Sequence, residues 1–263
     1  MRNLFLRQGK VLLVLLILFL AVFIGFNFWL SNKYVVPIIM YHSIDSPHLL
    51  SGTVVNPENF ERQLNFFKKH NYDVISLNEL VTSLLEKKKL PRNSIVITFD
   101  DGYADNYSNG FRILKKYGFP ATIFIITNLI DRPGYLTWRQ LREMERFGIT
   151  IGSHTLDHVY LPGVPLNWQS HQIKESKKVI EKNLGHPIDY FAYPSGGFSD
   201  GTKDVVIEAG YKGACTTNRG NKRFNEDVYE LKRVRFSNKE NELSMWAKLS
   251  GYYNLLRVLK EGN

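Results

Sequence analysis

The chain has 263 residues, of which 44% are hydrophobic and 13% aromatic, and this excludes a largely disordered polypeptide. Its formal charge of +9, from 34 basic and 25 acidic residues, favours an anionic neighbour such as a cell wall or a lipid surface. The sequence lacks zinc-finger spacing and a basic region with heptads, so we expect no nucleic-acid partner. The single Cys215 excludes an intrachain disulfide, and its place in a predicted strand favours a buried packing role.

The first predicted element is a membrane-spanning helix. Residues 11–30 are apolar, with Asn27 as their one strongly polar member. Twenty such residues at helical rise are long enough to cross the hydrocarbon layer of a bilayer. The run is longer than the apolar part of a normal signal peptide, and bulky residues at its end disfavour cleavage, although a cleaved signal peptide remains the alternative.

The basic residues near this helix indicate its orientation. Arg2, Arg7 and Lys10 precede the apolar run, and Lys33 alone closely follows it. By the positive-inside rule the N-terminus is then cytoplasmic. The sequence therefore predicts a cytoplasmic segment at 1–10, a transmembrane anchor at 11–30 and an extracytoplasmic domain at 31–263.

After the anchor, short apolar runs alternate with helical patterns. The predicted strands are 35–40, 73–76, 95–99, 121–126, 149–152, 190–193, 213–216 and 234–236.

Capping residues mark three of the predicted helices. Asn56 followed by Pro57 is a favourable helix start. Thr137 caps a second helix, and a third runs over 168–184 with Gly185 as its stop. Alternating strands and helices predict an α/β fold, namely a distorted barrel of seven to eight parallel strands, with an open doubly wound sheet as the alternative.

Two segments that follow predicted strands carry the chemistry. Asp100 and Asp101 come directly after the strand at 95–99, and His154 and His158 come after a later strand. Asp101 followed by glycine could be a turn or a helix cap, but a cap explains one aspartate and not two. Two histidines four residues apart can bind a transition metal from one helical turn. Together with one carboxylate they suit zinc and leave a position open for water.

His42 and Ser195 also follow predicted strands. In a parallel barrel the carboxyl ends of the strands share one rim, which is where barrel enzymes keep their active sites. We therefore expect these two residues to lie at the same rim as the aspartates and histidines.

The segments 98–101 and 154–158 resemble the first two motifs of the polysaccharide deacetylases that carry a NodB homology domain (carbohydrate esterase family 4). The resemblance covers most of residues 35–240, and these two motifs in this order are specific for that family. It implies a distorted barrel, a divalent metal that is usually zinc, and removal of acetyl groups from N-acetylglucosamine polymers. It also implies the roles of the matching residues, with Asp100 as general base and Asp101, His154 and His158 as metal ligands.

Later motifs depart from the commonest family pattern. Where many members have Arg-x-Pro-Tyr, residues 192–197 read Ala-Tyr-Pro-Ser-Gly-Gly, so we expect no arginine beside Asp100. The late Leu-x-His motif is replaced by Leu-Lys-Arg at 231–233. The segments 36–42 and 191–194 instead resemble the subgroup that deacetylates poly-N-acetylglucosamine in biofilms, in which an early Tyr-His pair belongs to the site.

His42 is the expected general acid, with a packing role as its alternative. The chain has seven histidines, and of the five that are not expected on the metal only His42 directly follows a predicted strand. His70, His171 and His186 are expected at the surface or at helix caps, and Asn106 is expected to face solvent.

Four residues are expected to contact the substrate. A backbone N–H near Tyr193, Pro194 or Ser195 would hold the oxyanion. Tyr103 would stack on a sugar ring, and Tyr41 and Trp138 are further candidates for stacking, although packing is an equal alternative for these aromatic residues.

The sequence therefore predicts metal-dependent removal of N-acetyl groups from a cell-surface or extracellular glycan. The expected partner is poly-N-acetylglucosamine, peptidoglycan or a chitin-like polymer, together with the membrane through the N-terminal helix. Two alternatives stay open. One is a hydrolase of another amide or ester with the same metal centre. The other is a wall-glycan-binding module whose catalysis has decayed.

Overall fold

The structure is a computed structural model that describes residues 2–31, 33–46, 52–220 and 224–256. Residue 1 and residues 257–263, which fall within the predicted segments 1–10 and 31–263, lie outside the described residues. Internal contacts divide the chain into two units, Met1–Tyr34 and Val35–Asn263.

The first unit contains one long helix, α1 (Arg2–Ser31). Within it the stretch Leu13–Leu30 is apolar, and none of that stretch is buried in the structure. Eighteen residues at 1.5 Å each give about 27 Å, close to the thickness of a hydrocarbon layer. The helix is thus long and apolar enough to cross a membrane, as either an anchor or a signal segment.

The second unit is a barrel of parallel strands, in the order β10-β9-β8-β7-β6-β5-β1-β11. A ninth strand, β4, pairs with β5, and a separate two-stranded sheet joins β2 to β3. The strands are β1 (Ile38–Tyr41), β2 (Ser43–Ile44), β3 (Val54–Val55), β4 (Asp73–Val74), β5 (Ser94–Phe99), β6 (Ala121–Ile125), β7 (Ile149–Ser153), β8 (Tyr190–Ala192), β9 (Gly213–Thr216), β10 (Leu231–Lys232) and β11 (Val234–Arg235).

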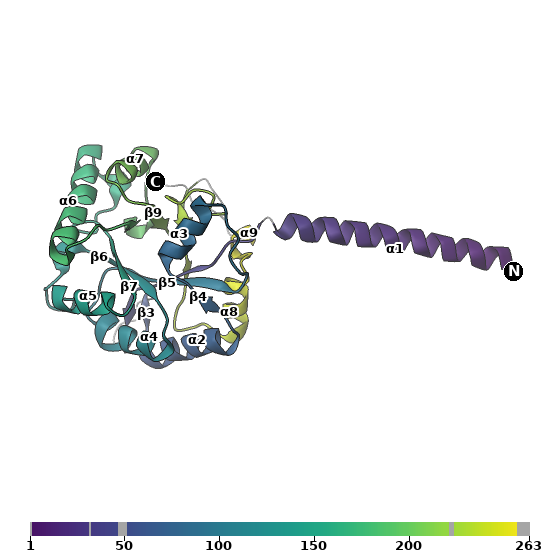
Figure 1. Cartoon of the computed structure of the whole chain (residues 1–263), viewed down its shortest axis with the longest axis horizontal. Helices are drawn as coiled ribbons and strands as arrows, with labels where there is room; N and C mark the ends of the chain where they lie inside the picture. The colour runs from purple at the N-terminus through teal and green to yellow at the C-terminus, as the bar shows by residue number, and fades with distance from the viewer. Residues whose placement is uncertain (1, 32, 47–51, 221–223, 257–263) are drawn as a thin grey trace. The chain divides into compact units, whose positions relative to one another are not determined.

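Helices surround these strands, as Figure 1 shows for the teal, green and yellow parts of the chain. They bury an apolar face against the sheet; in α2, for example, Phe60, Leu64 and Phe67 are buried at i, i+4 and i+7. The α-helices of this unit are α2 (Pro57–Lys69), α3 (Leu77–Leu85), α4 (Arg112–Tyr117), α5 (Trp138–Glu145), α6 (Leu166–Leu184), α7 (Asp200–Glu208), α8 (Glu242–Leu249) and α9 (Tyr253–Leu256). Short helical turns occur at η1 (Asn106–Phe111), η2 (Thr127–Leu129), η3 (Leu161–Gly163) and η4 (Pro194–Gly196).

One segment brings the two ends of the barrel together. Strand β10 pairs with β9, whereas β11 pairs with β1, and Arg233 alone separates β10 from β11. The Arg233 N–H donates to the carbonyl of Thr217, and the Phe236 N–H donates to the carbonyl of Met40. Residues 231–235 therefore contact both end strands, and the barrel is nearly closed.

The predicted distorted barrel is confirmed, and each of the eight predicted strands overlaps an observed one. The helix starts at Asn56 and Thr137 and the stop at Gly185 are confirmed as well. The prediction missed β2, β3 and β10, which are two residues long and do not lie in a longer apolar run such as those that mark β4 and β11. Cys215 is buried in β9, as expected.

Candidate active site

A cleft of about 550 Å³ lies at the carboxyl ends of the strands. Asp100 and Asp101 follow β5, His154 follows β7 and His42 follows β1. All four residues line the cleft, together with His158. Parallel strands present their carboxyl ends at one rim, and this is why residues far apart in the sequence meet there.

Asp101, His154 and His158 form a group that fits a metal ion. One carboxylate oxygen of Asp101 lies 3.7 Å from Nε2 of His154 and 3.5 Å from Nε2 of His158. The three candidate ligand atoms all lie within 4.8 Å of one another. Ligands of a tetrahedral zinc ion are spaced by about 3.3 Å, given bonds of about 2.0 Å. The donor set and its spacing therefore suit a single divalent ion.

The His154 ring is held in the tautomer that a metal ligand needs. Its Nδ1 lies 2.7 Å from the carbonyl oxygen of Ala192. A carbonyl only accepts, so Nδ1 carries the proton and the lone pair of Nε2 faces Asp101. Burial lowers the pKa of His154, against the opposing effect of Asp100 and Asp101, and this favours the neutral imidazole.

The backbone around the ligands adopts rare conformations. Asp101, Thr155, His158 and Ser195 have φ values of 73°, 69°, 57° and 54°, in the left-handed region that non-glycine residues seldom occupy. Such conformations persist where the surrounding structure enforces them, and they cluster at functional sites.

A buried glutamine fixes the loop between the two histidines. The Gln172 side chain on α6 accepts hydrogen bonds from the N–H groups of Leu156 and Asp157 and donates to the Asp157 carboxylate. The His158 N–H donates to the hydroxyl of Thr155. These hydrogen bonds pair the backbone N–H groups of the turn and hold both imidazoles toward Asp101. No pattern in the sequence pointed to Gln172.

Asp100 makes a bidentate ion pair with Arg233, at 2.6 and 2.7 Å. Arg233 is 1% exposed, and it also donates to the hydroxyl of Thr98 and to the carbonyl of Thr216. Burial alone would raise the pKa of Asp100, but the charge and hydrogen bonds of Arg233 outweigh it and lower that pKa to about 2. The expectation that no arginine lies beside Asp100 is therefore wrong: the guanidinium comes from Arg233, the residue between β10 and β11, and not from the segment after β8.

His42 lies at the cleft, and its Nδ1 is buried without a hydrogen-bond partner among the described residues. Burial lowers the pKa of His42, while the carboxylates of Asp100 and Asp101 act in the opposite direction. Asn106 is 1% exposed, and its amide donates to the backbone carbonyl of His42. The expectation that Asn106 faces solvent is wrong, because the π-helical turn η1 directs it inward.

The predicted substrate-contacting residues differ in where they lie. Tyr103 and Ser195 line the cleft. The Tyr193 side chain is fully buried and stacks on Phe198, and Pro194 is buried too, so these two side chains do not line the cleft.

Backbone bonding narrows the choice of oxyanion donor. The Tyr193 N–H donates to the Cys215 carbonyl and Pro194 has no N–H, which leaves the Ser195 N–H.

Of the aromatic residues expected to stack on sugar, Tyr103 alone lines the cleft. Its ring stacks on Tyr135 with centroids 5.4 Å apart. Burial and the neighbouring Asp101 raise its pKa, so the phenol stays protonated. Tyr41 is buried and donates to Gln63, and Trp138 packs against the core.

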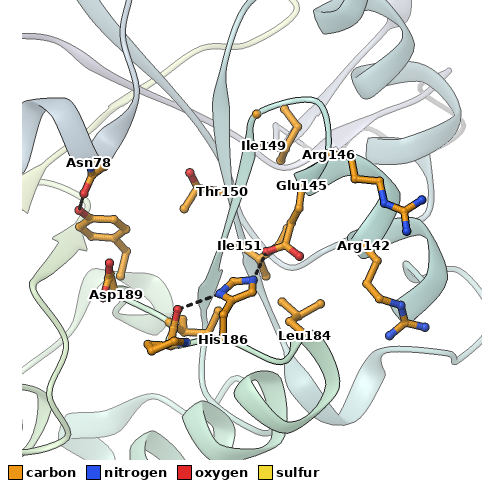
Figure 2. Close-up of a pocket in the computed structure, with 14 residues that line it drawn as sticks. Asn78, Arg142, Glu145, Arg146, Ile149, Thr150, Ile151, Leu184, His186 and Asp189 are labelled. Carbon is orange, nitrogen blue, oxygen red and sulfur yellow. Dashed lines mark hydrogen bonds and ion pairs between the residues drawn. The ribbon is translucent and has the colours of Figure 1, made fainter.

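A second hollow of about 700 Å³ lies at the opposite ends of β7 and β8 (Figure 2). There His186 contacts Glu145 at 2.9 Å and the Pro187 carbonyl at 3.0 Å, as the dashed lines show. His186 is exposed, as expected, as is His171, while His70 caps α2. Among the described residues, the metal-binding group found lies at the other rim.

The fold and this site define a barrel enzyme with its reactive groups at the carboxyl rim. A family model described as polysaccharide deacetylase matches residues 87–214. YxkH of Bacillus subtilis (strain 168) is 36% identical over 201 residues, which are 76% of this chain and 71% of YxkH. The chain therefore belongs to the polysaccharide deacetylase family, whose members are hydrolases of carbon–nitrogen bonds, and the predicted family is confirmed.

Other relatives indicate the subgroup. The poly-beta-1,6-N-acetyl-D-glucosamine N-deacetylase of Staphylococcus epidermidis is 31% identical over 210 residues, 72% of each chain. The structure of Streptococcus pyogenes deacetylase PplD in complex with acetate matches with a TM-score of 0.74 and 30% identity, over 81% of this chain and 97% of PplD. IcaB from Ammonifex degensii shares the fold, with a TM-score of 0.72 and 22% identity over 84% of this chain and 97% of IcaB.

The Asp100–Arg233 pair yields a prediction for stability. Arg233→Met leaves a buried carboxylate without its partner, so metal-free protein at pH 7 should lose about 3–5 kcal/mol of unfolding free energy. In the wild type the folded pKa of Asp100, about 2, lies below the unfolded value. Its stabilising contribution is thus complete above about pH 4 and is lost as the pH falls through 2.

In the variant, burial without Arg233 raises the pKa of Asp100, so the deficit should shrink as the pH falls from 8 to 5. Urea unfolding with a chelator present measures this. Asp100→Asn combined with Arg233→Met is the control, since removing the charge should recover stability and abolish that pH dependence. Equal stability of the single variant and the wild type at pH 7 would show that the pair is not a stabilising contact.

Proposed function

We propose that this chain hydrolyses N-acetyl groups on an N-acetylglucosamine-containing polysaccharide at the cell surface, with a divalent ion held by Asp101, His154 and His158. Two imidazoles and one carboxylate make zinc the expected ion. The main observation behind the proposal is that two adjacent carboxylates have different partners. Asp101 faces the two imidazoles, while Asp100 is paired with Arg233 and remains ionised.

The names of the relatives support a particular class of substrate. The staphylococcal relative is named for poly-beta-1,6-N-acetyl-D-glucosamine, and it matches 72% of this chain. This supports a β-linked N-acetylglucosamine polymer as substrate, with peptidoglycan and chitin-like chains as the alternatives that an experiment distinguishes.

A divalent ion held by Asp101, His154 and His158 would supply Lewis-acid chemistry, polarising the acetyl carbonyl and lowering the pKa of the attacking water to about 7. The protein supplies the base, because Asp100 is ionised at neutral pH and can accept the proton of the attacking water. Arg233 occupies one lone pair on each oxygen of Asp100 and fixes the plane of the carboxylate, which leaves the remaining lone pairs for that proton. The Ser195 N–H is the proposed donor to the developing oxyanion.

The proposed acid is His42, which would protonate the departing amine. It lines the cleft beside both aspartates. The Asn106 side chain holds the backbone of His42 in place by donating a hydrogen bond to the His42 carbonyl.

Acetate release tests the function directly. The full-length protein in detergent should release acetate from β-1,6-linked N-acetylglucosamine polymer, lose this activity with a chelator and regain it with zinc. Peptidoglycan and chitin oligomers assayed in parallel rank the substrates. If none of these glycans releases acetate with zinc present, the proposal is contradicted. Activity confined to other amides or esters would favour the alternative of a metal-dependent hydrolase with a different substrate.

The two adjacent aspartates serve as matched variants in that assay. Asp101→Ala should lose at least about 10-fold in zinc affinity. Asp100→Asn should keep its zinc and lose about 10²–10⁴-fold in turnover, because an amide cannot accept the proton. His186→Ala, at the opposite end of the barrel, is the control and should change neither. Unchanged zinc affinity in Asp101→Ala, or normal turnover in Asp100→Asn, would refute the assigned roles.

His42→Ala separates an acid from a packing residue. If His42 protonates the amine, the variant should bind zinc normally, while kcat on the amide falls about 10²–10⁴-fold. The loss should be much smaller on an activated acetyl ester, whose leaving group departs without a proton. Equal losses on both substrates would mark His42 as structural.

We also propose that α1 holds the catalytic domain outside the cytoplasmic membrane. Its apolar stretch Leu13–Leu30 and the basic residues before that stretch support this orientation. Protease added to intact cells with a permeable outer envelope should degrade the domain, while a cytoplasmic marker survives. Protection of the domain until lysis would refute the orientation, and recovery of the domain in the medium would indicate cleavage.

A further inference from the structure

Side chains of a distant turn hold the segment that carries His42. The Asn106 amide donates to the His42 carbonyl at 2.7 Å and to a carboxylate oxygen of Asp105 at 2.9 Å. Asp105 in turn accepts a hydrogen bond from the Ser43 hydroxyl at 2.7 Å and one from the Ile44 N–H at 2.8 Å. Two neighbouring side chains therefore contact three consecutive residues, beginning at His42.

A third side chain of the same turn adds to this arrangement. Asn109 donates to the Ile44 carbonyl at 2.7 Å, and Ile44 is fully buried. Because β2 pairs with β3 over two residues, contacts from outside the sheet contribute to its position. Asp105 directly precedes η1, a π-helical turn, and such turns are frequent at functional sites. We call Asp105, Asn106 and Asn109 the 105–109 cluster.

The position of the His42 ring depends on this backbone. His42 lines the cleft, but its Nδ1 is buried and makes no hydrogen bond with the described residues. Because that nitrogen gives the ring no polar anchor, the segment 42–44 determines where the imidazole lies. A general acid must come within about 2.6–3.2 Å of the atom that it protonates, and a displacement of about 1 Å can cost about 10²-fold in rate.

The charge of Asp105 does not stabilise the fold. Burial raises the pKa of Asp105, and the hydrogen bonds from Ile44, Ser43 and Asn106 offset this only in part. A carboxyl group whose pKa is higher in the folded than in the unfolded state lowers stability at pH values above that pKa. What Asp105 supplies is therefore geometric, namely two acceptor oxygens for the segment that carries His42.

We propose that Asp105, supported by the rest of the 105–109 cluster, is a positioning residue that holds the His42 imidazole where it can protonate the departing amine. This rests on the proposed deacetylase function, with His42 as its acid, and adds the residues that place that acid. Asp105 acts by accepting hydrogen bonds and not through its charge. Its removal should affect protonation of the leaving group and leave the metal ligands as they are, since its hydrogen bonds go to the segment 43–44 and to Asn106.

The kinetic test compares an amide with an activated acetyl ester in the zinc-loaded full-length protein. Asp105→Ala should lower kcat for acetate release from β-1,6-linked N-acetylglucosamine polymer about 10-fold to 10²-fold. The loss on the activated ester should be much smaller, because its leaving group departs without a proton. Zinc affinity should stay at the wild-type value. Asp189→Ala, at the opposite end of the barrel, removes a half-buried carboxylate that pairs with Lys212, and as the control it should change none of these quantities.

A double-mutant cycle separates positioning from a general structural role. In the His42→Ala background, Asp105→Ala should lower kcat on the polymer by no more than about twofold, because the group that it positions is already gone. Asp105→Asn should recover most of the activity, since its amide oxygen can accept from the Ile44 N–H while its NH₂ group donates to the Ser43 hydroxyl. Ser43→Ala removes one of these hydrogen bonds and should show the same dependence on the leaving group with a smaller loss, which keeps the test decisive if Asp105→Ala does not fold.

Nuclear magnetic resonance gives a readout that does not depend on turnover. The ring resonances of His42, assigned by comparison with His42→Ala, should shift or broaden in Asp105→Ala and in Ser43→Ala. They should stay near their wild-type positions in Asp105→Asn and in Asp189→Ala.

The proposal is overturned if Asp105→Ala and Ser43→Ala lose as much on the activated ester as on the polymer, or if their losses multiply with that of His42→Ala. It is also overturned if Asp105→Asn is as impaired as Asp105→Ala, or if the His42 resonances are unchanged in Asp105→Ala. If the wild type releases no acetate from any glycan, the deacetylase function fails instead, and the His42 resonances still decide whether Asp105 positions that ring.

Discussion

Asp100 and Arg233 lie 133 residues apart in the sequence and form a buried, bidentate ion pair where the barrel closes. Each partner depends on the other, because an isolated buried charge costs several kcal/mol. Arg233 separates the strand that pairs with β9 from the strand that pairs with β1. Closure of the barrel therefore carries the guanidinium to the carboxylate. The same contact that completes the fold also keeps the proposed base ionised and oriented.

The proposed metal ligands depend on a different kind of constraint. Asp101 and His158 adopt left-handed backbone conformations, and Thr155 between the histidines does so too. Each such residue costs of order 1 kcal/mol or more, so the fold must enforce it. Gln172 does so for the histidine loop through three hydrogen bonds from α6. The ligand positions are therefore set by the helix packed behind the strands as well as by the strands themselves.

The parts of the site that sequence reasoning found are those with a local signal. The aspartate pair directly follows an apolar strand, and the two histidines are four residues apart. Both motifs can therefore be recognised within a few consecutive residues of the sequence. Arg233 and Gln172 have no such signal, because their roles arise from contacts with distant segments. The fold itself was predictable because strand and helix patterns alternate along the chain. Of the two short strands that close the barrel, β11 was predicted and β10 was missed.

The position of Arg233 also bears on the alternative of a decayed, wall-binding module. That alternative rested on the absence of an arginine beside Asp100, and the guanidinium of Arg233, from between β10 and β11, occupies this place. A protein that only binds glycan gains nothing from an ionised, buried carboxylate that follows directly on a second buried carboxylate in the chain, since nearby like charges disfavour ionisation. An apolar pair would fill the same volume at lower free energy. The charged arrangement, with both imidazoles directed at Asp101, is what the proposed reaction would require, since that reaction needs a base beside a metal.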